Sequence, residues 1–523
     1  MSDLSQRIAA LSPEKLKLLA QKLNKKKGDV LSKTPIVPQS LKSNTFPLSF
    51  AQQRLWFLDQ LEPGNPVFNI FQFMRLTGWL NVAVLKQSFQ EVVKRHGALR
   101  TTFTIVDGQP LQVIYPASVF KLQVVNLQEL PLDKREAEVL HLANQETQIS
   151  FDLTKDCLLR VTLLQLSEIE HILLLSMHHI AADAWSIGVL IREITTLYEN
   201  FSRGYPSPLP ELPIQYADFA VWQRQWLQGE QLEAQLAYWK QQLGGQLPVL
   251  ELPTDMARAT VQTFNGARQY LVLPKTFSEQ LKALYQREGI TLFMILLAGF
   301  KTLLYSYTGQ EDIVIGTDIA NRNQSEIREL IGFFVNQLVL RTNLSGNPSF
   351  HELLERVREV TLNAYAHQDL PFDKLVDALN PVRHMARSPL FQVKLILENT
   401  QIPSFELSNL TIKSLNVEKK TTQLDLLWEI AETEQGIVAA LEYNTDLFDI
   451  TTIARMLKHF ETLLNQVVTK PTAKLNELIG FLTAADKQEE FFRNKNTKEE
   501  YKHKLKTIKR QVINTATEME EGK

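Results

Sequence analysis

The sequence predicts a mixed α/β protein built from two related lobes. At 523 residues the chain is too long for one ordinary hydrophobic core, so two domains of about 200 residues each are expected. Segments that alternate like strands interleave with segments whose apolar residues have helical spacing. From Asn265 onward a second unit repeats the strand and helix order of the first, without a residue-level repeat.

The composition narrows the class of protein. Hydrophobic residues make up 44% and charged residues 22% of the chain, and the net charge is -2. This balance gives no electrostatic argument for binding nucleic acid or an anionic membrane. The single cysteine, Cys157, excludes an intramolecular disulfide and favours a reducing compartment. The N-terminal segment lacks the apolar core of a signal peptide, and no apolar run reaches about 18 residues, so a soluble cytoplasmic protein is expected.

The first predicted lobe spans residues 46–215 and follows an N-terminal helix and linker at 1–45. The helix, at residues 5–24, is either a packed flap or a segment that faces a partner. In the lobe, Ser49 is expected to cap a helix over residues 50–58. The predicted elements that follow are a strand at 69–76, a helix at 82–94, strands at 98–105, 111–115 and 171–177, and a helix that starts near Trp185 or Ser186.

The remaining chain divides into a connection, a second lobe and a tail. Residues 216–264 are read as a connecting helix and linker, the helix running from Tyr216 towards Leu243 and stopping at Gly244. The second lobe, at 265–482, is predicted to hold a strand at 268–273, helices at 277–288 and 292–306, and a strand at 313–317. The charged tail at 483–523 is a solvated helix or a frayed end.

Two histidines and an aspartate lie on one strand-to-helix connection. His178 and His179 end a buried strand, and Asp183 precedes the next helix. A strand end places side chains at the rim of a sheet, where ligands usually enter. The alternative is one buried, hydrogen-bonded histidine beside an exposed one. A metal site is a weaker alternative, because no His, Cys or carboxylate cluster elsewhere in the sequence has ligand spacing.

Six further stretches accompany the histidine pair. They are residues 49–58, 95–103, 216–222, 331–337, 367–372 and 383–393. In this order and spacing, from about residue 45 to 480, the stretches resemble the condensation domains of nonribosomal peptide synthetases. Nothing that resembles an adenylating or carrier domain follows residue 482, so a free-standing enzyme or a piece of a larger synthetase is expected.

The resemblance implies both a fold and an activity. The fold would be two lobes, each like chloramphenicol acetyltransferase, in a V with a tunnel between them. The activity would be that of an acyltransferase, which joins a thioester-bound acyl or aminoacyl group to an amine. Donor and acceptor carrier proteins would deliver the substrates on phosphopantetheine, with no bound cofactor and no metal. The alternatives are ester formation, transfer to a free amine, or a catalytically silent recruitment module.

The resemblance also assigns roles at the histidine pair. His179 would accept the proton of the attacking amine or position that amine, and the sequence does not decide between the two. His178 would be more structural than catalytic. Asp183 could accept a histidine proton, as in a catalytic dyad, but it is expected to act as a structural acid paired with an arginine. Arg100 is the expected partner, and Arg95 is the second arginine of that segment.

Four residues are predicted to line the tunnel. Asn336 is the second-lobe candidate, with a strand-end amide as the alternative. Ala184, Trp185 and Ser186 are the first-lobe candidates, although Trp185 also fits a core position. Related loops have glycine where this chain has Ala184. If that position needs a positive φ, alanine costs about 1 kcal/mol; if not, its methyl group narrows the site.

Overall fold

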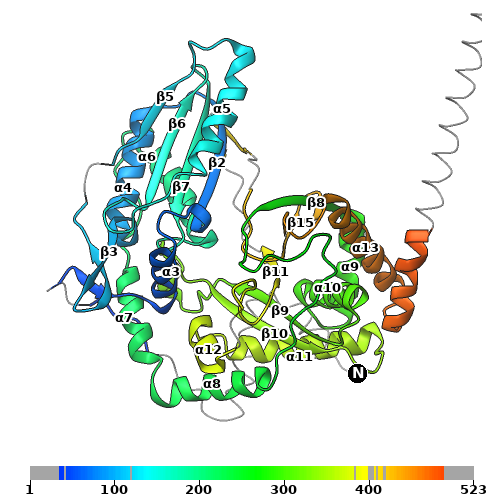
Figure 1. The fold of residues 1–523 in the computed structure, drawn as a ribbon. Coiled ribbons are helices and arrows are strands. Elements are labelled where there is room, and N and C mark those ends of the chain that lie inside the picture. The colour runs from blue at the N-terminus through cyan, green and yellow to red at the C-terminus, as the bar shows by residue number, and fades with distance from the viewer. Residues whose placement is uncertain are drawn as a thin grey trace, which may run out of the picture.

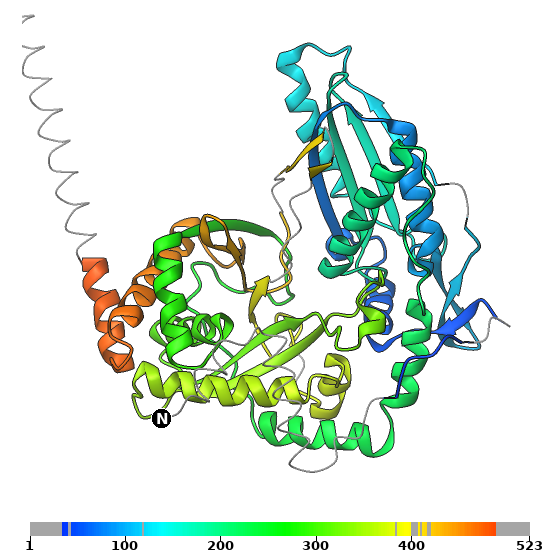
Figure 2. The same ribbon diagram turned by 180° about the vertical axis from the view of Figure 1, so that it is seen from behind.

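The computed structural model describes residues 34–39, 43–117, 120–381, 384–398, 406–407, 410–415 and 420–487. Two lobes stand apart as the arms of a V and meet at its base (Figures 1 and 2). The predicted helix at 5–24, residue Arg383 and most of the charged tail lie outside the described residues.

The first lobe is built on a six-stranded sheet with both faces covered. Its strand order is β12-β13-β2-β7-β6-β5. The strands are β2 (Asn69–Gly78), β5 (Gln123–Asn126), β6 (Leu159–Gln165), β7 (Glu170–His178), β12 (Glu406–Leu407) and β13 (Leu410–Ser414). Helices α4 (Val82–Arg95) and α6 (Ala184–Ser202) cover one face and α5 (Leu132–Glu146) covers the other (Figure 1). Leu173 and Leu174 are buried on opposite faces of the sheet. Because both faces of β7 are covered, its sequence is a continuous apolar run.

A smaller sheet lies beside this lobe. It pairs β1 (Thr45–Pro47), β4 (Gln109–Ile114) and β3 (Thr101–Val106). Ser49 caps α3 (Phe50–Leu61) through a capping box with Gln52, which confirms the predicted cap. The strand predicted at 98–105 begins only at Thr101, because Gly97–Arg100 form a 3-10 turn. The Thr101 hydroxyl closes that turn by donating to the Gly97 carbonyl at 2.8 Å.

The predicted connecting helix is two helices. They are α7 (Tyr216–Trp226) and α8 (Gly229–Leu243). The prediction of one continuous helix was wrong because the backbone leaves the helical region at Leu227, with ψ 67°, and is extended at Gln228, with φ -140° and ψ 167°. The two helices lead from the first lobe along the base of the V to the second (Figure 1).

The second lobe has one large core around another six-stranded sheet. Its order is β10-β9-β11-β14-β15-β8. The strands are β8 (Gly266–Pro274), β9 (Asp312–Ile319), β10 (Asn336–Asn343), β11 (Val393–Glu398), β14 (Leu426–Thr433) and β15 (Gly436–Asn444). The helices are α9 (Lys275–Arg287), α10 (Leu292–Thr308), α11 (Phe350–Ala366), α12 (Phe372–Leu379) and α13 (Ile450–Thr469). The predicted elements of this lobe are therefore present, with bounds that differ by a few residues.

Helix α10 runs through the second core. Its residues from Leu292 to Leu304 are all buried, including Lys301. Within the described residues no single helix has the length and apolar character to cross a membrane, and only the bent pair α9–α10 meets the criteria of length and composition.

Two segments of the second lobe cross to the first. Strand β13 comes from the sequence of the second lobe but pairs with β2, in a register that runs from Leu410 opposite Gly78 to Ser414 opposite Met74. Leu410 is buried in the first-lobe core. The connection between β9 and β10 also crosses to the first lobe, where it meets α6. The predicted second lobe at 265–482 is thus not a spatially separate unit.

Candidate functional site

A tight turn carries the two histidines from β7 into α6. The backbone N–H of Ala181 donates to the His178 carbonyl at 3.0 Å, and that of Ala182 donates to the His179 carbonyl at 3.2 Å. Asp183, with a φ of -131°, is the N-cap of α6. The helix therefore begins at Ala184, slightly before the predicted start. Ala184 is exposed, and its φ is not positive, so the loop does not require glycine there.

His178 is a buried structural histidine. Its side chain lies edge-on to Phe68 and Phe151, and its Nδ1 accepts a hydrogen bond from the Ile180 backbone at 3.1 Å. Burial, together with the neighbouring His179, lowers the pKa of His178 to about 3. The ring is therefore neutral at physiological pH and carries its proton on Nε2.

His179 is half-buried and oriented by its own turn. Its backbone N–H donates to the Phe68 carbonyl at 2.8 Å. Its Nδ1 lies 3.2 Å from the Ala182 carbonyl oxygen, which can only accept. In the neutral ring this contact places the proton on Nδ1 and the lone pair on Nε2. The ring also lies against Phe333 of the second lobe, with ring centroids 5.6 Å apart.

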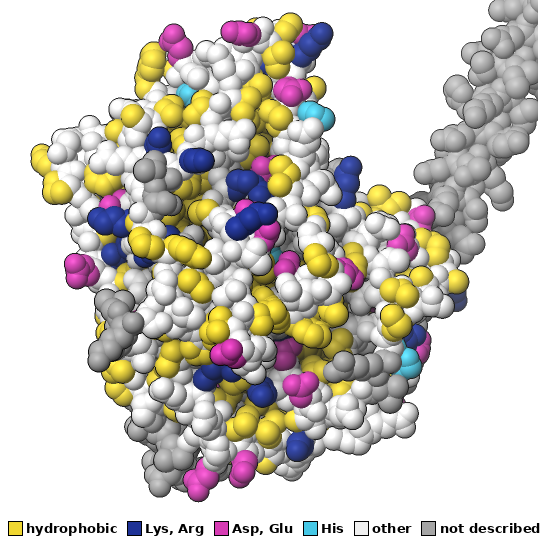
Figure 3. All heavy atoms as spheres, turned by 60° about the vertical axis from the view of Figure 1, so that its left-hand side comes forward, with side chains coloured by type: hydrophobic (Ala, Val, Ile, Leu, Met, Phe, Trp, Pro, Cys, Tyr) yellow, Lys and Arg dark blue, Asp and Glu magenta, His cyan; other side chains and the backbone are white. Residues whose placement is uncertain are grey.

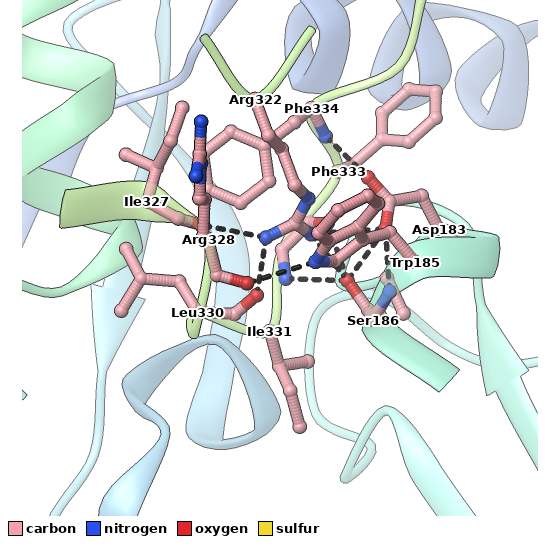
Figure 4. Close-up of polar contacts among 12 residues, drawn as sticks. Asp183, Trp185, Ser186, Arg322, Ile327, Arg328, Leu330, Ile331, Phe333 and Phe334 are labelled. Atoms are coloured by element: carbon pink, nitrogen blue, oxygen red, sulfur yellow. Dashed lines mark hydrogen bonds and ion pairs between the residues drawn. The ribbon is translucent and has the colours of Figure 1, made fainter. Parts of the chain in front are cut away.

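Asp183 joins the two lobes through a buried network (Figure 4). Its Oδ1 accepts from the Ser186 backbone at 2.8 Å, from the Ser186 hydroxyl at 2.7 Å and from Arg322 Nη2 at 3.0 Å. Its Oδ2 accepts from the Phe334 backbone at 3.0 Å. Asp183 and Arg322 side chains are 0% and 1% exposed, so this is a buried ion pair between lobes. The prediction of a structural, paired Asp183 agrees with this geometry.

Arg322, in the β9–β10 connection, is held by several contacts. Its Nη1 donates to the carbonyls of Ile327 and Leu330, each at 2.6 Å, and its guanidinium lies 4.1 Å from the Phe334 ring centroid. Burial lowers its pKa, and the charge of Asp183 opposes that shift. The cation is therefore fixed by one carboxylate and by the carbonyls of its own loop.

The prediction that Arg100 pairs with Asp183 was wrong. Arg100 donates to the carbonyls of Val93 and Lys94, at 3.0 and 3.3 Å, and to that of Tyr115. Its guanidinium thus satisfies carbonyls at the C-terminal end of α4, a favourable place for a cation.

Arg95 does not reach Asp183 either. Its Nε donates to Glu193 of α6 at 2.9 Å, and His96 Nε2 lies 2.8 Å from the same carboxylate. Burial raises the pKa of Glu193, but the hydrogen bond with His96 and the charge and hydrogen bond of Arg95 outweigh burial and lower it. His96 Nδ1 accepts from the Ile331 backbone at 3.3 Å, so this cluster also ties α6 to the crossing connection.

The predicted tunnel residues separate into two groups. Asn336 lines a cavity between the lobes, and its amide donates to the carbonyls of Gln368 and Leu370, at 2.9 and 2.7 Å. The prediction that Ser186 lines the tunnel was wrong. Its hydroxyl is buried and forms hydrogen bonds with the Asp183 carboxylate and the Gly332 carbonyl. Trp185 is half-buried and donates to the Arg328 carbonyl at 2.8 Å, so it too belongs to the lobe junction.

The cavity has a volume of 50 Å³. It is lined by α3, α7, the β9–β10 connection, the start of β10, the turn between α11 and α12, and α12, through Ala51, Arg54, Phe219, Gln223, Asn321, Phe333, Phe334, Val335, Asn336, Gln337, Asp369, Pro371, Phe372 and Asp373. Arg54 spans it by donating to Gln337 Oε1 at 3.1 Å, and lies 3.5 Å from Asp373. Among the described residues, no group of three His, Cys, Asp or Glu side chains could hold a metal ion.

Sequence reasoning missed Arg322 and Phe333. Arg322 lies 139 positions from Asp183, and no local pattern relates the two. Phe333 lies in the stretch 331–337 that carries the resemblance, but only Asn336 of that stretch was predicted to face the tunnel. On the face seen in Figure 3, basic, acidic and hydrophobic side chains are interspersed.

Comparisons with known proteins agree on one family. The family model described as Condensation domain matches residues 42–489. One polypeptide of the linear gramicidin synthase of Brevibacillus parabrevis is 46% identical over 467 residues, which are 89% of this chain and 9% of that protein. Another polypeptide of the same synthase is 49% identical over 427 residues, or 81% of this chain and 8% of that protein. The chain thus spans less than a tenth of these relatives.

Solved structures agree with the fold. The X-domain from teicoplanin biosynthesis is 29% identical with a TM-score of 0.76, over 84% of this chain and 99% of that chain. The first condensation domain of the calcium-dependent antibiotic synthetase is 19% identical with a TM-score of 0.70, over 83% and 99%. The latter likeness concerns the fold alone. Together with the V of two lobes, these matches confirm the predicted fold class.

Proposed function

Because the chain belongs to the condensation-domain family, we propose that it forms an amide bond between a carrier-bound acyl or aminoacyl thioester and an amine, itself carrier-bound. Phosphopantetheine arms of a donor and an acceptor carrier deliver the two substrates in the cytoplasm, and no resident cofactor takes part. The observation that carries the proposal is the presentation of His179 at the junction of the lobes, with the lone pair on Nε2.

The chemistry uses that lone pair. The amine nitrogen attacks the thioester carbonyl carbon, and a proton leaves the nitrogen for Nε2 of His179. The carbon–sulfur bond then breaks, the amide remains, and the proton returns to the departing thiolate, so atoms and charge balance. A histidine that only positions the amine would need the same Nε2 acceptor, and the same geometry supports either role.

Asp183 has no direct part in this chemistry. Its carboxylate is occupied by Ser186, Arg322 and the Phe334 backbone. By fixing the first turn of α6 and the crossing connection together, it sets the position of His179 against the second lobe. Asp183 is therefore a positioning residue.

The test is single-turnover transfer between loaded carrier proteins, followed by intact mass of both carriers. His179→Ala is expected to abolish product while the melting temperature stays near that of the wild type, because a half-buried ring is lost without stranding a buried charge. His141→Ala, on the exposed face of α5, is the matched control and should retain full transfer. Transfer at the wild-type rate by a folded His179→Ala protein would refute the proposal.

A recruitment module is the second candidate. The X-domain from teicoplanin biosynthesis, 28% identical in that structure, was solved in complex with OxyB, so a protein of this fold can dock another protein. The presence of His179 with an oriented ring favours catalysis for this chain. A wild-type protein that binds a partner but transfers no acyl group to any amine, with all candidate carriers loaded, would favour recruitment instead.

A further inference from the structure

Phe333 lies where the cavity between the lobes meets His179. Its half-buried ring lines the cavity and lies 5.6 Å from the His179 ring, centroid to centroid. The residue comes from the second lobe, whereas His179 comes from the first. Its ring therefore forms the contact between the wall of the cavity and the histidine.

The backbone around Phe333 is fixed. Its carbonyl accepts from the Tyr216 hydroxyl at 2.6 Å, and the next N–H, that of Phe334, donates to Asp183 at 3.0 Å. On the other side, the Gly332 N–H donates to the Ser186 hydroxyl at 3.1 Å. Because three consecutive residues are anchored to the first lobe, the ring of Phe333 can move only by rotation of its side chain.

The cavity is too small for a substrate arm as it stands. A volume of 50 Å³ leaves room for only a few water molecules. Polar groups, including Arg54 and Asn336, nevertheless reach the same walls, so the space suits a chain with amide and carbonyl groups more than a purely apolar one. A thioester on such a chain reaches His179 from this side only if a wall moves.

We propose that the ring of Phe333 is a gate between this cavity and His179, and that its size sets the bulk of the acyl or aminoacyl group admitted. This inference rests on the proposed function, because it names the group that selects substrates at the same site. Phe333 touches the reacting histidine but supplies no proton or charge, so it is a specificity-determining residue.

The first experiment measures kcat/KM for a small and a bulky aminoacyl group, varied separately on the donor and on the acceptor carrier. Phe333→Ala should raise the ratio of kcat/KM for the bulky group to kcat/KM for the small group by on the order of tenfold, either for the donor or for the acceptor substrate. Phe333→Trp should lower this ratio for the same substrate. Phe333→Leu, which keeps an apolar side chain, should fall between wild type and alanine. The side that responds identifies the substrate that enters through the cavity.

Phe57→Ala is the matched control, since it truncates a phenylalanine that is exposed on α3 and does not line the cavity. Its ratio of kcat/KM for the bulky group to that for the small group should remain that of the wild type. Folded Phe333 variants with wild-type ratios on both sides, or a Phe57→Ala protein that shifts the ratio as strongly, would overturn the gate.

A second readout does not require activity. Carbethoxylation of His179 by diethyl pyrocarbonate, followed by peptide mass spectrometry, should be several-fold faster in Phe333→Ala than in wild type or Phe57→Ala. If the wild type transfers no acyl group, the proposed function fails while this rate still tests the gate. An unchanged rate in Phe333→Ala would then count against the gate.

Discussion

At the scale of single residues, the ion pair between Asp183 and Arg322 is the contact that holds the site together. Both groups are buried, and the pair joins the first turn of α6 to a connection from the other lobe. Removing one partner leaves the other charge buried without its counter-ion. Breaking such a pair from one side typically costs about 3–5 kcal/mol, which is a large part of the stability of an ordinary domain.

We therefore predict that Asp183→Ala and Arg322→Ala each lower the free energy of unfolding by about 3–5 kcal/mol and slow transfer. The double variant should lose less than the two single losses added together, because residues in contact are not additive. Urea denaturation of the four proteins in the cycle measures this coupling. Arg100→Ala is the control arginine and should show no coupling to Asp183→Ala; additive losses with Arg322→Ala would contradict the assignment.

A second prediction at the scale of single residues concerns Lys301, whose amino group lies in the core of the second lobe. Its Nζ donates to the carbonyls of Ile313 and Leu340, at 2.9 and 2.7 Å. Burial lowers its pKa from 10.5 to about 7, with Asp312 opposing the shift. Between pH 7 and 10.5 the unfolded chain binds a proton that the folded chain releases. Stability should therefore rise with pH in that window, by at most about 1.4 kcal/mol per pH unit.

Lys301→Met removes this titration and keeps a long apolar stem. Its two carbonyl acceptors lose a donor, a cost that does not depend on pH. Relative to this variant, the wild type should gain stability steadily as the pH is raised from about 7 to about 10. Denaturant midpoints at several pH values measure the difference, and parallel curves for the two proteins would show that the lysine does not titrate in the core.

At the scale of elements, the β9–β10 connection depends on one glycine. A Cβ at Gly332 would lie 2.0 Å from the Tyr216 ring and 2.9 Å from the Phe334 ring. We predict that Gly332→Ala lowers the free energy of unfolding by about 1–3 kcal/mol and impairs transfer, because it pushes Phe333 and Phe334 away from the first lobe. Unfolding midpoints and single-turnover rates are the measurements.

Gly188→Ala provides the matched control for that substitution. Gly188 lies inside α6, where an added Cβ meets nothing within 4 Å. Alanine there should stabilise the helix by up to about 1 kcal/mol and leave transfer unchanged. If both glycine variants behave alike, close packing at Gly332 is not what holds the connection in place.

Elements with local signals could be predicted from the sequence, and those set by distant partners could not. The cap at Ser49 and the start of α6 beside Asp183 follow from residue types at helix ends. The break at Leu227 and Gln228 has a weaker signal, because only Gly229 beside it differs from a helical pattern, and glycine is tolerated inside helices. The partner of Asp183 has no local signal, since any buried arginine would satisfy the carboxylate. Which arginine arrives there depends on how the two lobes dock.

At the scale of the whole molecule, a strand that crosses from the second lobe makes the lobes interdependent. Strand β13 pairs with β2 of the first-lobe sheet, with β12 outside it at the edge, although the sequence of β13 lies among second-lobe elements. No periodicity within residues 410–414 indicates which of the two sheets it joins. The pairing of β13 with β2 and the contact of Arg322 with Asp183 both connect segments far apart in the chain. Both depend on how the two lobes dock, so neither could be predicted from the sequence.

Leu410 tests whether the lobes unfold together. Its side chain, 4% exposed, packs in the first-lobe core from a segment of the second. We predict that Leu410→Ala lowers the free energy of unfolding by about 2–5 kcal/mol. It should also shift the whole melting transition, measured by calorimetry, as one peak, because losing β13 weakens the first lobe and detaches a tie to the second. Lys413→Ala, exposed on the same strand, should change stability by less than about 0.5 kcal/mol. A Leu410→Ala protein whose melt splits into two transitions, one at the wild-type temperature, would mean that the second lobe is stable without the first, and that β13 does not make the two lobes unfold together.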